Sequence, residues 1–516
     1  MIDFDDIFIL IPLIKALIFL KNNYDILQFI HLSLPIVFLV IIRYLFANKY
    51  QQYFTTKKFR NVFNGIILGE LTVPLLLISI LNEMNENSST FSNYSLFEKQ
   101  MKLYVFMTSL FGFIPFFKTR FFIFGVILLC FSFIFYVSLS WEFLFVPIFG
   151  TIIFSQLFRL FSEVLSNSFA FAECIFLSEF FSLIISFFSV CFFAGFQLSF
   201  SKITETEMQG KSFVIMLTCL VIFASAGVAI FLSFFVSGIF QSRSSLFFYL
   251  VLISSGFFSV QFCFYFLFKR NIFMWLFGFV FSTRNRIILM ALWVVMMGLL
   301  IFLMNLELFE KFHKKSANIL IRKIFHLFLL FIMIPGILLD LNLLQLSLAV
   351  SVNVLFVIEA VRMKKEVWLS ESINIFMQKF TDQRDSGDLI LTHIYLVFGS
   401  SFSVWMVFFC QYNGLKSGFL VASSGIFLLG VGDSLASFVG SKLGTINWFG
   451  KKKTIEGTLA FFVGVLFCTG FIWLIDDIDF SFFGFCLDLL LISVLEALTD
   501  LIDNLILPIY FIILLC

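Results

Sequence analysis

A glycine-rich stretch of the sequence carries an acidic residue in a setting where acidic residues are costly. Residues 430–444 read GVGDSLASFVGSKLG. Small residues recur there at every fourth position and so share one helix face, against which a second helix can pack closely; they are Gly432, Ala436, Gly440 and Gly444. Asp433 lies beside this face near the end of an apolar span, where an ionisable side chain needs a partner or a metal ion. We therefore take Asp433 as a candidate for catalysis and metal binding; the alternative is a charge at a helix end that reaches water.

Three consecutive lysines follow this stretch and directly precede Thr454. They are Lys451, Lys452 and Lys453. Thr454 is a suitable N-cap for a helix from about residue 455 to residue 475. The free N–H groups and positive dipole at that helix start, together with the ammonium groups, favour a polyphosphate. A lysine cluster at a membrane boundary is also typical of a topology signal or a contact with anionic lipids.

The first turn of the predicted helix supplies further candidates. We expect Lys452 and Lys453 to hold a triphosphate with help from the backbone amides of Gly457 and Thr458. Glu456 has three open interpretations: it complements the helix dipole, orders the lysines or contacts a metal-bound water.

A second group of carboxylates follows an apolar span near residues 481–499. Glu496, Asp500 and Asp503 are spaced by four and three residues, so they share one helical face. Phosphoryl transfer requires charge neutralisation and in-line positioning, usually with a divalent ion that bridges phosphate oxygens. Asp433 and Asp503 are the first candidates for binding such an ion, and Glu496 is the next. The alternative for the residues near 500 is a solvated helix terminus.

Other ionisable residues have more than one interpretation. Arg384, Asp385 and Ser386 lie in a long polar loop, where Arg384 could hold a phosphate or pair with Asp385. His326 and His393 lie near span ends, where a histidine commonly joins two helices by a hydrogen bond but could also act as a base. A carboxylate that accepts the substrate proton is equally suitable.

The elements that position these residues must be membrane helices. The chain is 61% hydrophobic and 13% charged, with a mean hydropathy of +1.05, whereas a soluble domain carries about a quarter charged residues. Apolar stretches long enough to cross a bilayer recur along the chain, and they are too continuous for the strands of a membrane barrel. We predict an all-α, polytopic transmembrane helical bundle of roughly 13 to 16 spans. The net charge of +2 does not indicate nucleic acid, so the lipid bilayer is the only partner that composition implies.

The charges of the loops predict the orientation of the spans. From about residue 308 onward, loops rich in Lys and Arg alternate with loops that are almost devoid of them; the basic loops are residues 308–323, 362–388 and 442–453. The positive-inside rule places these loops, and the turn at 500–504, in the cytoplasm. Glycosylation sequons at Asn87 and Asn93 indicate a lumenal loop in the first half. Four distant polar segments should thus meet at one membrane face, where we expect the active site.

Several motifs, in this order, resemble the dolichol kinases. Those near the lysines are GxGDSxAS at 430–437, KKTxEGT at 452–458, Glu496, and DNLILP at 503–508. Those upstream are RKIFH at 322–326, IPGILLD at 334–340, Glu359 with Arg362, and RDSGDLILTHIYL at 384–396. The resemblance covers roughly residues 320 to 516. Asp388 stands where the family pattern has proline, which puts only the local loop shape in question.

The resemblance implies a multi-pass kinase of the endoplasmic reticulum membrane. Such an enzyme transfers the terminal phosphate of CTP to the hydroxyl of dolichol, a long polyprenol, and releases CDP and dolichyl phosphate for the lipid carrier of protein glycosylation. A divalent metal ion such as Mg²⁺ and a cytoplasmic active site are implied with it. The catalytic candidates are then Asp433, Arg384, Asp385 and His326. The nucleotide-binding candidates are Gly430, Gly432, Ser434, Gly444, Lys451, Lys452, Lys453, Thr454, Glu456, Gly457 and Thr458. The metal candidates are Asp433, Asp503 and Glu496.

On this basis residues 311–516 form the CTP-dependent polyprenol kinase membrane domain. Residues 1–310 form a multi-span membrane region in which we find no catalytic constellation. Two alternatives stay open. Gly457 and the lysines also resemble phosphatidate cytidylyltransferases, which use CTP but release pyrophosphate, and a membrane transporter would have similar hydropathy. Transporters place polar groups at the bilayer midplane, whereas the ionisable residues here gather at one interface.

Overall fold

The computed structural model describes most of the 516-residue chain. The described ranges are residues 8–45, 66–86, 94–116, 120–137, 145–165, 168–193, 212–240, 244–305, 317–378, 387–411, 418–448, 451–475, 481–499 and 501–515. These residues form helices and no strand, with one isolated antiparallel bridge between Asn447 and Thr454. A helix satisfies its own backbone hydrogen bonds in lipid, and the predicted all-α fold class is confirmed.

Seven helices of the described part are long and apolar enough to cross a membrane, and seven further apolar helices are shorter. The seven long helices fit a polytopic membrane bundle, and the predicted number of 13 to 16 spans stays a prediction. The long ones are Phe145–Val164, Val214–Ile239, Ser245–Phe268, Arg284–Phe302, Leu341–Met363, Gly418–Leu443 and Ile455–Trp473.

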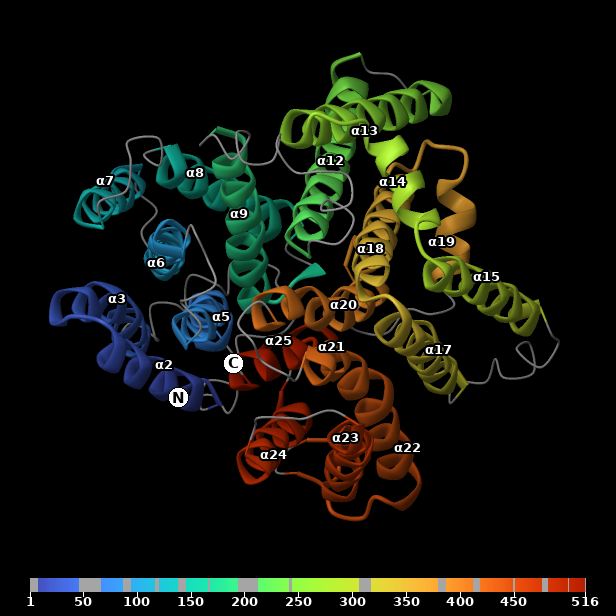
Figure 1. The fold of residues 1–516 in the computed structure, drawn as a ribbon. Coiled ribbons are helices and arrows are strands. Elements are labelled where there is room, and N and C mark those ends of the chain that lie inside the picture. Colours follow the sequence, from blue (N-terminus) through green and yellow to red (C-terminus); the bar gives the residue numbers. More distant parts are fainter. Residues whose placement is uncertain are drawn as a thin grey trace.

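The first part of the chain forms a group of helices on one side of the bundle (Figure 1). They are α2 (Leu10–Asn23), α3 (Ile26–Leu45), α5 (Ile66–Glu86), α6 (Tyr94–Phe111), η2 (Ile114–Phe116), α7 (Arg120–Tyr136), α8 (Phe145–Arg159), η4 (Leu160–Val164) and α9 (Phe171–Phe193). α5 packs against α6 and α9. A Cβ on Gly69 of α5 would lie 2.9 Å from the Cα of Ala172, so glycine allows the backbones of α5 and α9 to approach closely.

A second group joins this part to the rest. It comprises α12 (Ser212–Ile239), α13 (Ser245–Phe268), α14 (Ile272–Phe281) and α15 (Arg284–Asn305). α12 packs against α13 on one side and against α18 (Leu341–Met363) on the other.

The remaining helices carry the predicted site residues. They are α17 (Ala317–Leu339), α18, α19 (Ser370–Gln378), α20 (Thr392–Gln411), α21 (Gly418–Ile426), η7 (Phe427–Gly432), α22 (Asp433–Leu443), α23 (Ile455–Ile475), α24 (Phe482–Leu498) and α25 (Asp503–Leu515). α21, η7 and α22 follow one another without a break, and η7 is a π-helical segment that ends directly before Asp433. The helix predicted from about residue 455 to residue 475 is confirmed as α23.

α25 lies at the centre of the bundle (Figure 1). Its residues from Asn504 to Leu515 are buried, and it contacts α20, α24, α21 and α5. One hydrophobic core therefore contains residues from both sides of position 310. The domain boundary near that position stays a prediction.

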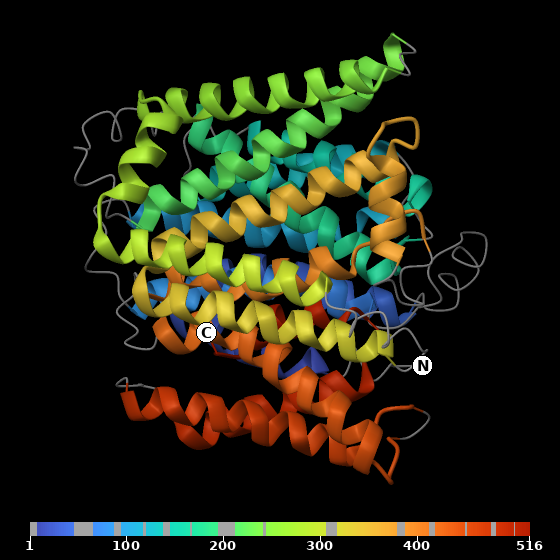
Figure 2. The same ribbon diagram turned by 90° about the vertical axis from the view of Figure 1, so that its right-hand side faces the viewer.

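Most helices run side by side (Figure 2). α19 and the hairpin between α22 and α23 lie at the same end in that view. The sequence predicted this arrangement for the basic loops that contain them.

Candidate functional site

A polar cavity of about 360 Å³ lies where α17, α20 and α22 to α25 meet. Many of the predicted site residues line it: His326, Asp433, Lys452, Lys453, Thr454, Gly457, Thr458, Glu496 and Asp503. The cavity thus brings together the glycine-rich stretch, the lysines and the turn before α25, although these are far apart in sequence.

Three carboxylates converge in this cavity. Asp433 begins α22 directly after η7, Glu496 lies in the last turn of α24, and Asp503 begins α25. One oxygen from each carboxylate lies within 4.8 Å of the other two. Asp433 and Glu496 are buried and Asp503 is partly buried. Within the described residues no other group of three or more His, Cys, Asp or Glu side chains converges in this way.

Lys453 balances the charge of these carboxylates. Its Nζ lies 2.5 Å from Oε1 of Glu496, 2.6 Å from the Glu496 carbonyl oxygen and 3.7 Å from Oδ2 of Asp503. Burial lowers the pKa of the Lys453 ammonium, but the Glu496 and Asp503 carboxylates raise it by more, so the net pKa is above its ordinary value. The lysine therefore stays charged at neutral pH, and its charge allows acidic groups to be buried beside it.

His326 lies beside Asp433 in the cavity. Its Nε2 lies 3.6 Å from Oδ2 of Asp433, and both side chains are buried. A Cβ on Gly430 would lie 3.4 Å from the His326 carbonyl oxygen. α17 and η7 therefore pack closely at the level of His326. His393 is half-buried on α20 and does not line the cavity.

Thr454 caps α23, as predicted. Its Oγ1 accepts a hydrogen bond from the Gly457 N–H at 3.2 Å, and its carbonyl accepts one from the Thr458 N–H at 3.1 Å. Both amides thus donate within the helix start, and both residues line the cavity. Their predicted role in holding a phosphate stays a prediction. Lys452 and Lys453 line the same cavity beside this helix start.

Glu456 does not line the cavity and holds the hairpin between α22 and α23. Its carboxylate accepts hydrogen bonds from the Thr445 N–H at 2.9 Å, the Ile446 N–H at 3.2 Å and the Thr445 hydroxyl. Of its three possible roles, ordering the lysine-bearing hairpin is the one that these contacts fit.

The small residues of the glycine-rich stretch pack α22 against α23. A Cβ on Gly457 would lie 2.9 Å from the Ala436 carbonyl oxygen, and one on Gly432 would lie 2.8 Å from the Phe461 ring. Several nucleotide-binding candidates do not line the cavity themselves; they are Gly430, Gly432, Ser434, Gly444, Lys451 and Glu456. Gly432 and Gly457, which make these close approaches, support the wall of the cavity that carries Asp433.

Thr392, Ser437 and Ser441 also line the cavity but were missed by sequence reasoning. Asp433, Ser437 and Ser441 are spaced by four residues and so share a helix face, a signal that could have found them. Thr392 begins α20, inside the block that starts at Arg384. Arg384 and Asp385 lie outside the described residues, and their roles stay predictions.

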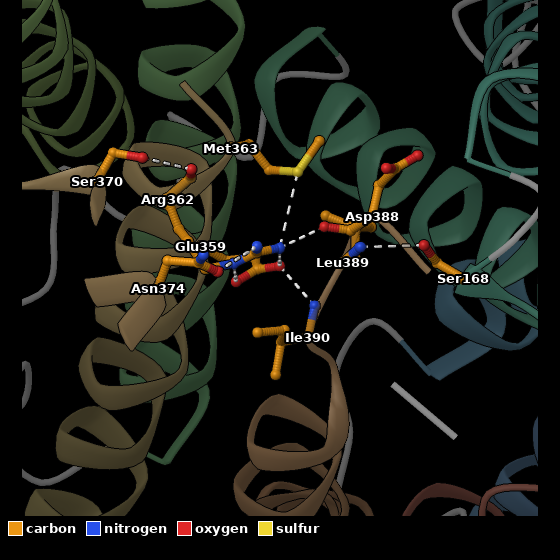
Figure 3. A network of polar contacts seen from close by, with 9 residues as sticks. All are labelled: Ser168, Glu359, Arg362, Met363, Ser370, Asn374, Asp388, Leu389 and Ile390. Atoms are coloured by element: carbon orange, nitrogen blue, oxygen red, sulfur yellow. Dashed lines mark hydrogen bonds and ion pairs between the residues drawn. The ribbon is translucent and has the colours of Figure 1, made fainter. Parts of the chain in front are cut away.

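An ion pair fixes the segment that leads to Thr392 (Figure 3). On α18, Arg362 donates to both carboxylate oxygens of Glu359, at 2.8 and 2.7 Å. Glu359 also accepts from the Ile390 N–H at 2.7 Å, and Arg362 donates to the Asp388 carbonyl. Asp388 is thus held through its backbone carbonyl, which proline would also provide. The departure from the family pattern leaves this contact intact.

The first half of the chain holds the same segment from the other side. The Ser168 hydroxyl accepts from the Leu389 N–H at 3.1 Å (Figure 3). A Cβ on Gly387 would lie 2.6 Å from the Cα of Ser168, so only glycine fits this approach. Glu173 of α9, which is fully buried, accepts from the Ile502 N–H at 3.3 Å and from the Ala170 N–H at 2.9 Å. Ile502 directly precedes Asp503, so residues 168–173 contact two segments that border the cavity.

Comparison with known proteins places the chain in a family. A family model described as dolichol kinase matches residues 182–462, which is more than half of the chain. The chain belongs to the dolichol kinase family. The dolichol kinase match begins in α9, upstream of the motifs at 322–396, and includes Asp433 and the lysines. It ends before Glu496 and Asp503.

Curated dolichol kinases are similar over about half of the chain. The chain is 37% identical to "Dolichol kinase" of Bos taurus over 282 residues, 53% of this chain and 52% of that one. It is 38% identical to "Dolichol kinase" of Homo sapiens over 259 residues, 48% of each chain. It is 30% identical to "Dolichol kinase EVAN" of Arabidopsis thaliana over 258 residues, 48% of this chain and 44% of that one. The match therefore spans about half the length of these dolichol kinases. No solved structure matches the chain.

Proposed function

We propose that this chain phosphorylates dolichol with CTP at the cytoplasmic face of the endoplasmic reticulum membrane. The products would be CDP and dolichyl phosphate, the lipid carrier used in protein glycosylation. The observation that carries the proposal is the meeting of Asp433, Lys453 and Asp503 in one cavity at one end of the helical bundle. Membership of the dolichol kinase family supports the alcohol as the acceptor.

The carboxylates of Asp433, Glu496 and Asp503 would hold a divalent metal ion such as Mg²⁺. The donor set fits such an ion, because it consists of carboxylate oxygens within 4.8 Å of one another and hard cations prefer oxygen ligands. When bound, the ion would neutralise charge on the phosphates.

The side chains of the cavity have complementary tasks in this proposal. Lys452 and Lys453 bind the triphosphate, and Lys453 also orients Glu496. In the transfer, the alcohol oxygen forms a bond to the terminal phosphorus as the bond from that phosphorus to the CDP oxygen breaks. The alcohol proton passes to a base, and His326 and Asp433 are the neighbouring groups placed to accept it.

The test uses the purified chain in detergent with CTP labelled on its terminal phosphate, Mg²⁺ and dolichol. Labelled dolichyl phosphate is expected, and Asp433→Ala should lower its rate by about 10²–10³-fold or more, as removal of one charge-stabilising group does. Asp488→Ala is the matched control, because Asp488 pairs with Lys15 at 3.3 Å and does not line the cavity.

The products separate the proposal from its alternatives. Release of pyrophosphate together with a cytidylylated lipid would show that the chain catalyses cytidylyl transfer instead of phosphoryl transfer. Full activity of Asp433→Ala would remove Asp433 from the mechanism and leave the family assignment intact. Absence of any lipid product, together with solute uptake by proteoliposomes, would favour a transporter.

A further inference from the structure

A second cavity, apolar and about 170 Å³ in volume, lies inside the bundle. α5, α6, α9 and α12 form its walls on one side, and α18 and α20 form them on the other. Leu77, Phe181, Leu220, Phe402 and Trp405 are among the side chains that line it.

The amide of Gln345 contributes to this cavity but is already engaged by protein. Its Nε2 donates to the Val404 carbonyl at 2.9 Å, while the Gln345 backbone carbonyl accepts from Trp405 Nε1 at 3.1 Å. The walls are otherwise mostly aliphatic and aromatic side chains. A ligand that fits here is therefore a hydrocarbon, held by burial of apolar surface.

α20 connects this cavity to the candidate active site. Its first residue, Thr392, lines the polar cavity, while Phe398, Phe402 and Met406 line the apolar one. A helix rises about 1.5 Å per residue, so the apolar cavity begins about 9 Å and ends about 21 Å along the helix from Thr392. Both distances fit within a hydrocarbon layer of about 30 Å. The apolar cavity thus lies deeper in the membrane than the site of phosphoryl transfer.

We infer that the apolar cavity binds the isoprenoid chain of the alcohol substrate, several carbons away from the reacting hydroxyl. This inference rests on the proposed function and assigns a second part of the substrate to a second site. An engineered apolar cavity of about 150 Å³ is known to bind benzene, so the volume here suffices for at least one five-carbon unit. A void of this size lowers stability when empty, and a bound chain would restore the lost contacts.

The composition of the walls suits a methyl-branched chain. Met101, Met216 and Met406 line the cavity, and methionine adapts its shape to irregular apolar ligands. Four of the six wall helices precede residue 310. The first half of the chain thereby takes part in binding the substrate as well as in embedding the protein.

The experiment fills the cavity and compares two alcohols. Leu220→Trp on α12 and Ile184→Trp on α9 each place a larger side chain at the wall. Dolichol is compared with citronellol, a short alcohol with the same saturated head that does not reach the far end of the cavity. The filled variants should lose about tenfold in kcat/KM for dolichol, the scale of a misfit in an apolar pocket, and remain within about twofold of the parent for citronellol. Val228 lies on an exposed side of α12, at 44% exposure, so the Val228→Trp variant should have the same kcat/KM as the parent for both alcohols.

The outcomes distinguish this inference from the proposed function. Equal losses for both alcohols in both filled variants, or no loss for either alcohol, would overturn the chain site. If the parent phosphorylated neither alcohol, the proposed function would fail. Binding of dolichol to the apolar cavity would then be tested separately by photolabelling. A dolichol with a photoreactive group within its chain should label the peptides around Leu220 and Phe402; labelling confined to other helices would refute the site.

Discussion

Lys453 is the residue on which the electrostatics of the site depend most directly. It contacts Glu496 and Asp503, so its loss leaves two buried or partly buried carboxylates without a cationic partner. We expect Lys453→Gln to lower kcat with CTP by about 10²–10³-fold. Lys453→Arg should recover only part of the activity, because a planar guanidinium does not replace a compact ammonium. Steady-state measurement of kcat and of KM for CTP checks both.

Lys451→Gln is the matched control for this substitution. Lys451 belongs to the same triplet but does not line the cavity, so we expect a change of less than about threefold. Equal losses in the two variants would show that the triplet acts as a diffuse basic patch rather than through Lys453.

At this scale the sequence predicted the charged residues of the site but not their pairing. An aspartate beside a small-residue face and a lysine triplet before a helix cap are visible as residue types and spacings. The contact of Lys453 with Glu496 requires α24 to lie against the hairpin, and no local pattern encodes that. Thr392 carries a neutral hydroxyl, a group that is too common in membrane helices to mark a site.

Among the elements, the contact between α22 and α23 positions the lysine-bearing hairpin. We expect Gly457→Ala to push the helices apart, because its Cβ would lie 2.9 Å from the Ala436 carbonyl oxygen, and overpacking costs about 1–3 kcal/mol. Gly470→Ala on the same helix meets nothing within 4 Å and should be neutral. Thermal unfolding in detergent and the CTP assay measure the difference. A Gly457→Ala variant as stable and active as Gly470→Ala would contradict the packing role.

The turn before α25 depends on an acceptor from α9. We expect Glu173→Ala to leave the N–H groups of Ile502 and Ala170 without their carboxylate acceptor, at a cost of about 1–3 kcal/mol. Because Asp503 follows Ile502, the variant should also need a higher Mg²⁺ concentration for half-maximal activity. Glu173→Gln retains one carbonyl acceptor and should fall between the parent and the alanine variant.

A surface glutamate provides the control for Glu173. Glu163 pairs with Arg159 at 3.0 Å and is about half-exposed, so Glu163→Ala should leave the Mg²⁺ dependence unchanged. If Glu173→Ala also left it unchanged, the contact would be purely structural.

The sequence predicted the elements themselves better than the links between them. α23 and its Thr454 cap follow from an N-cap residue before a long apolar run. The π-helical segment η7 was not predicted, since its residues are as apolar as those of a regular helix. Ser168 and Glu173 were missed because single polar residues in an apolar half give no local sign that they contact distant segments.

For the whole molecule, labelling can test which side of the membrane each end of the helical bundle faces. Ser441 and Asp388 are exposed near the candidate site, and Ser481 is exposed at the start of α24. With an impermeant maleimide on sealed microsomes, we expect Ser441→Cys and Asp388→Cys to react from the cytoplasmic side. Ser481→Cys should react only after permeabilisation, in a background without reactive native cysteines. Labelling of all three from one side would refute the predicted topology.

Composition and loop charge were sufficient to predict a polytopic helical bundle and to group its basic segments. They could not predict that α25 lies at the centre or that α5 and α9 share a core with it. In lipid every helix is apolar on most faces, so hydropathy does not distinguish a buried helix from a peripheral one.

η7 lets the continuous helix from Gly418 to Leu443 take up one extra residue before Asp433. A π-helical turn holds about one residue more than an α-helical turn and completes the same rotation with it. Deleting one residue from 427–432 would therefore let this stretch become a regular helix while Asp433 still faced His326. Deleting two residues would exceed the surplus of the π-helical turn and would rotate the helix after it by about 100°. Homologous chains in this family should therefore differ by at most one residue between the start of α21 and the aspartate.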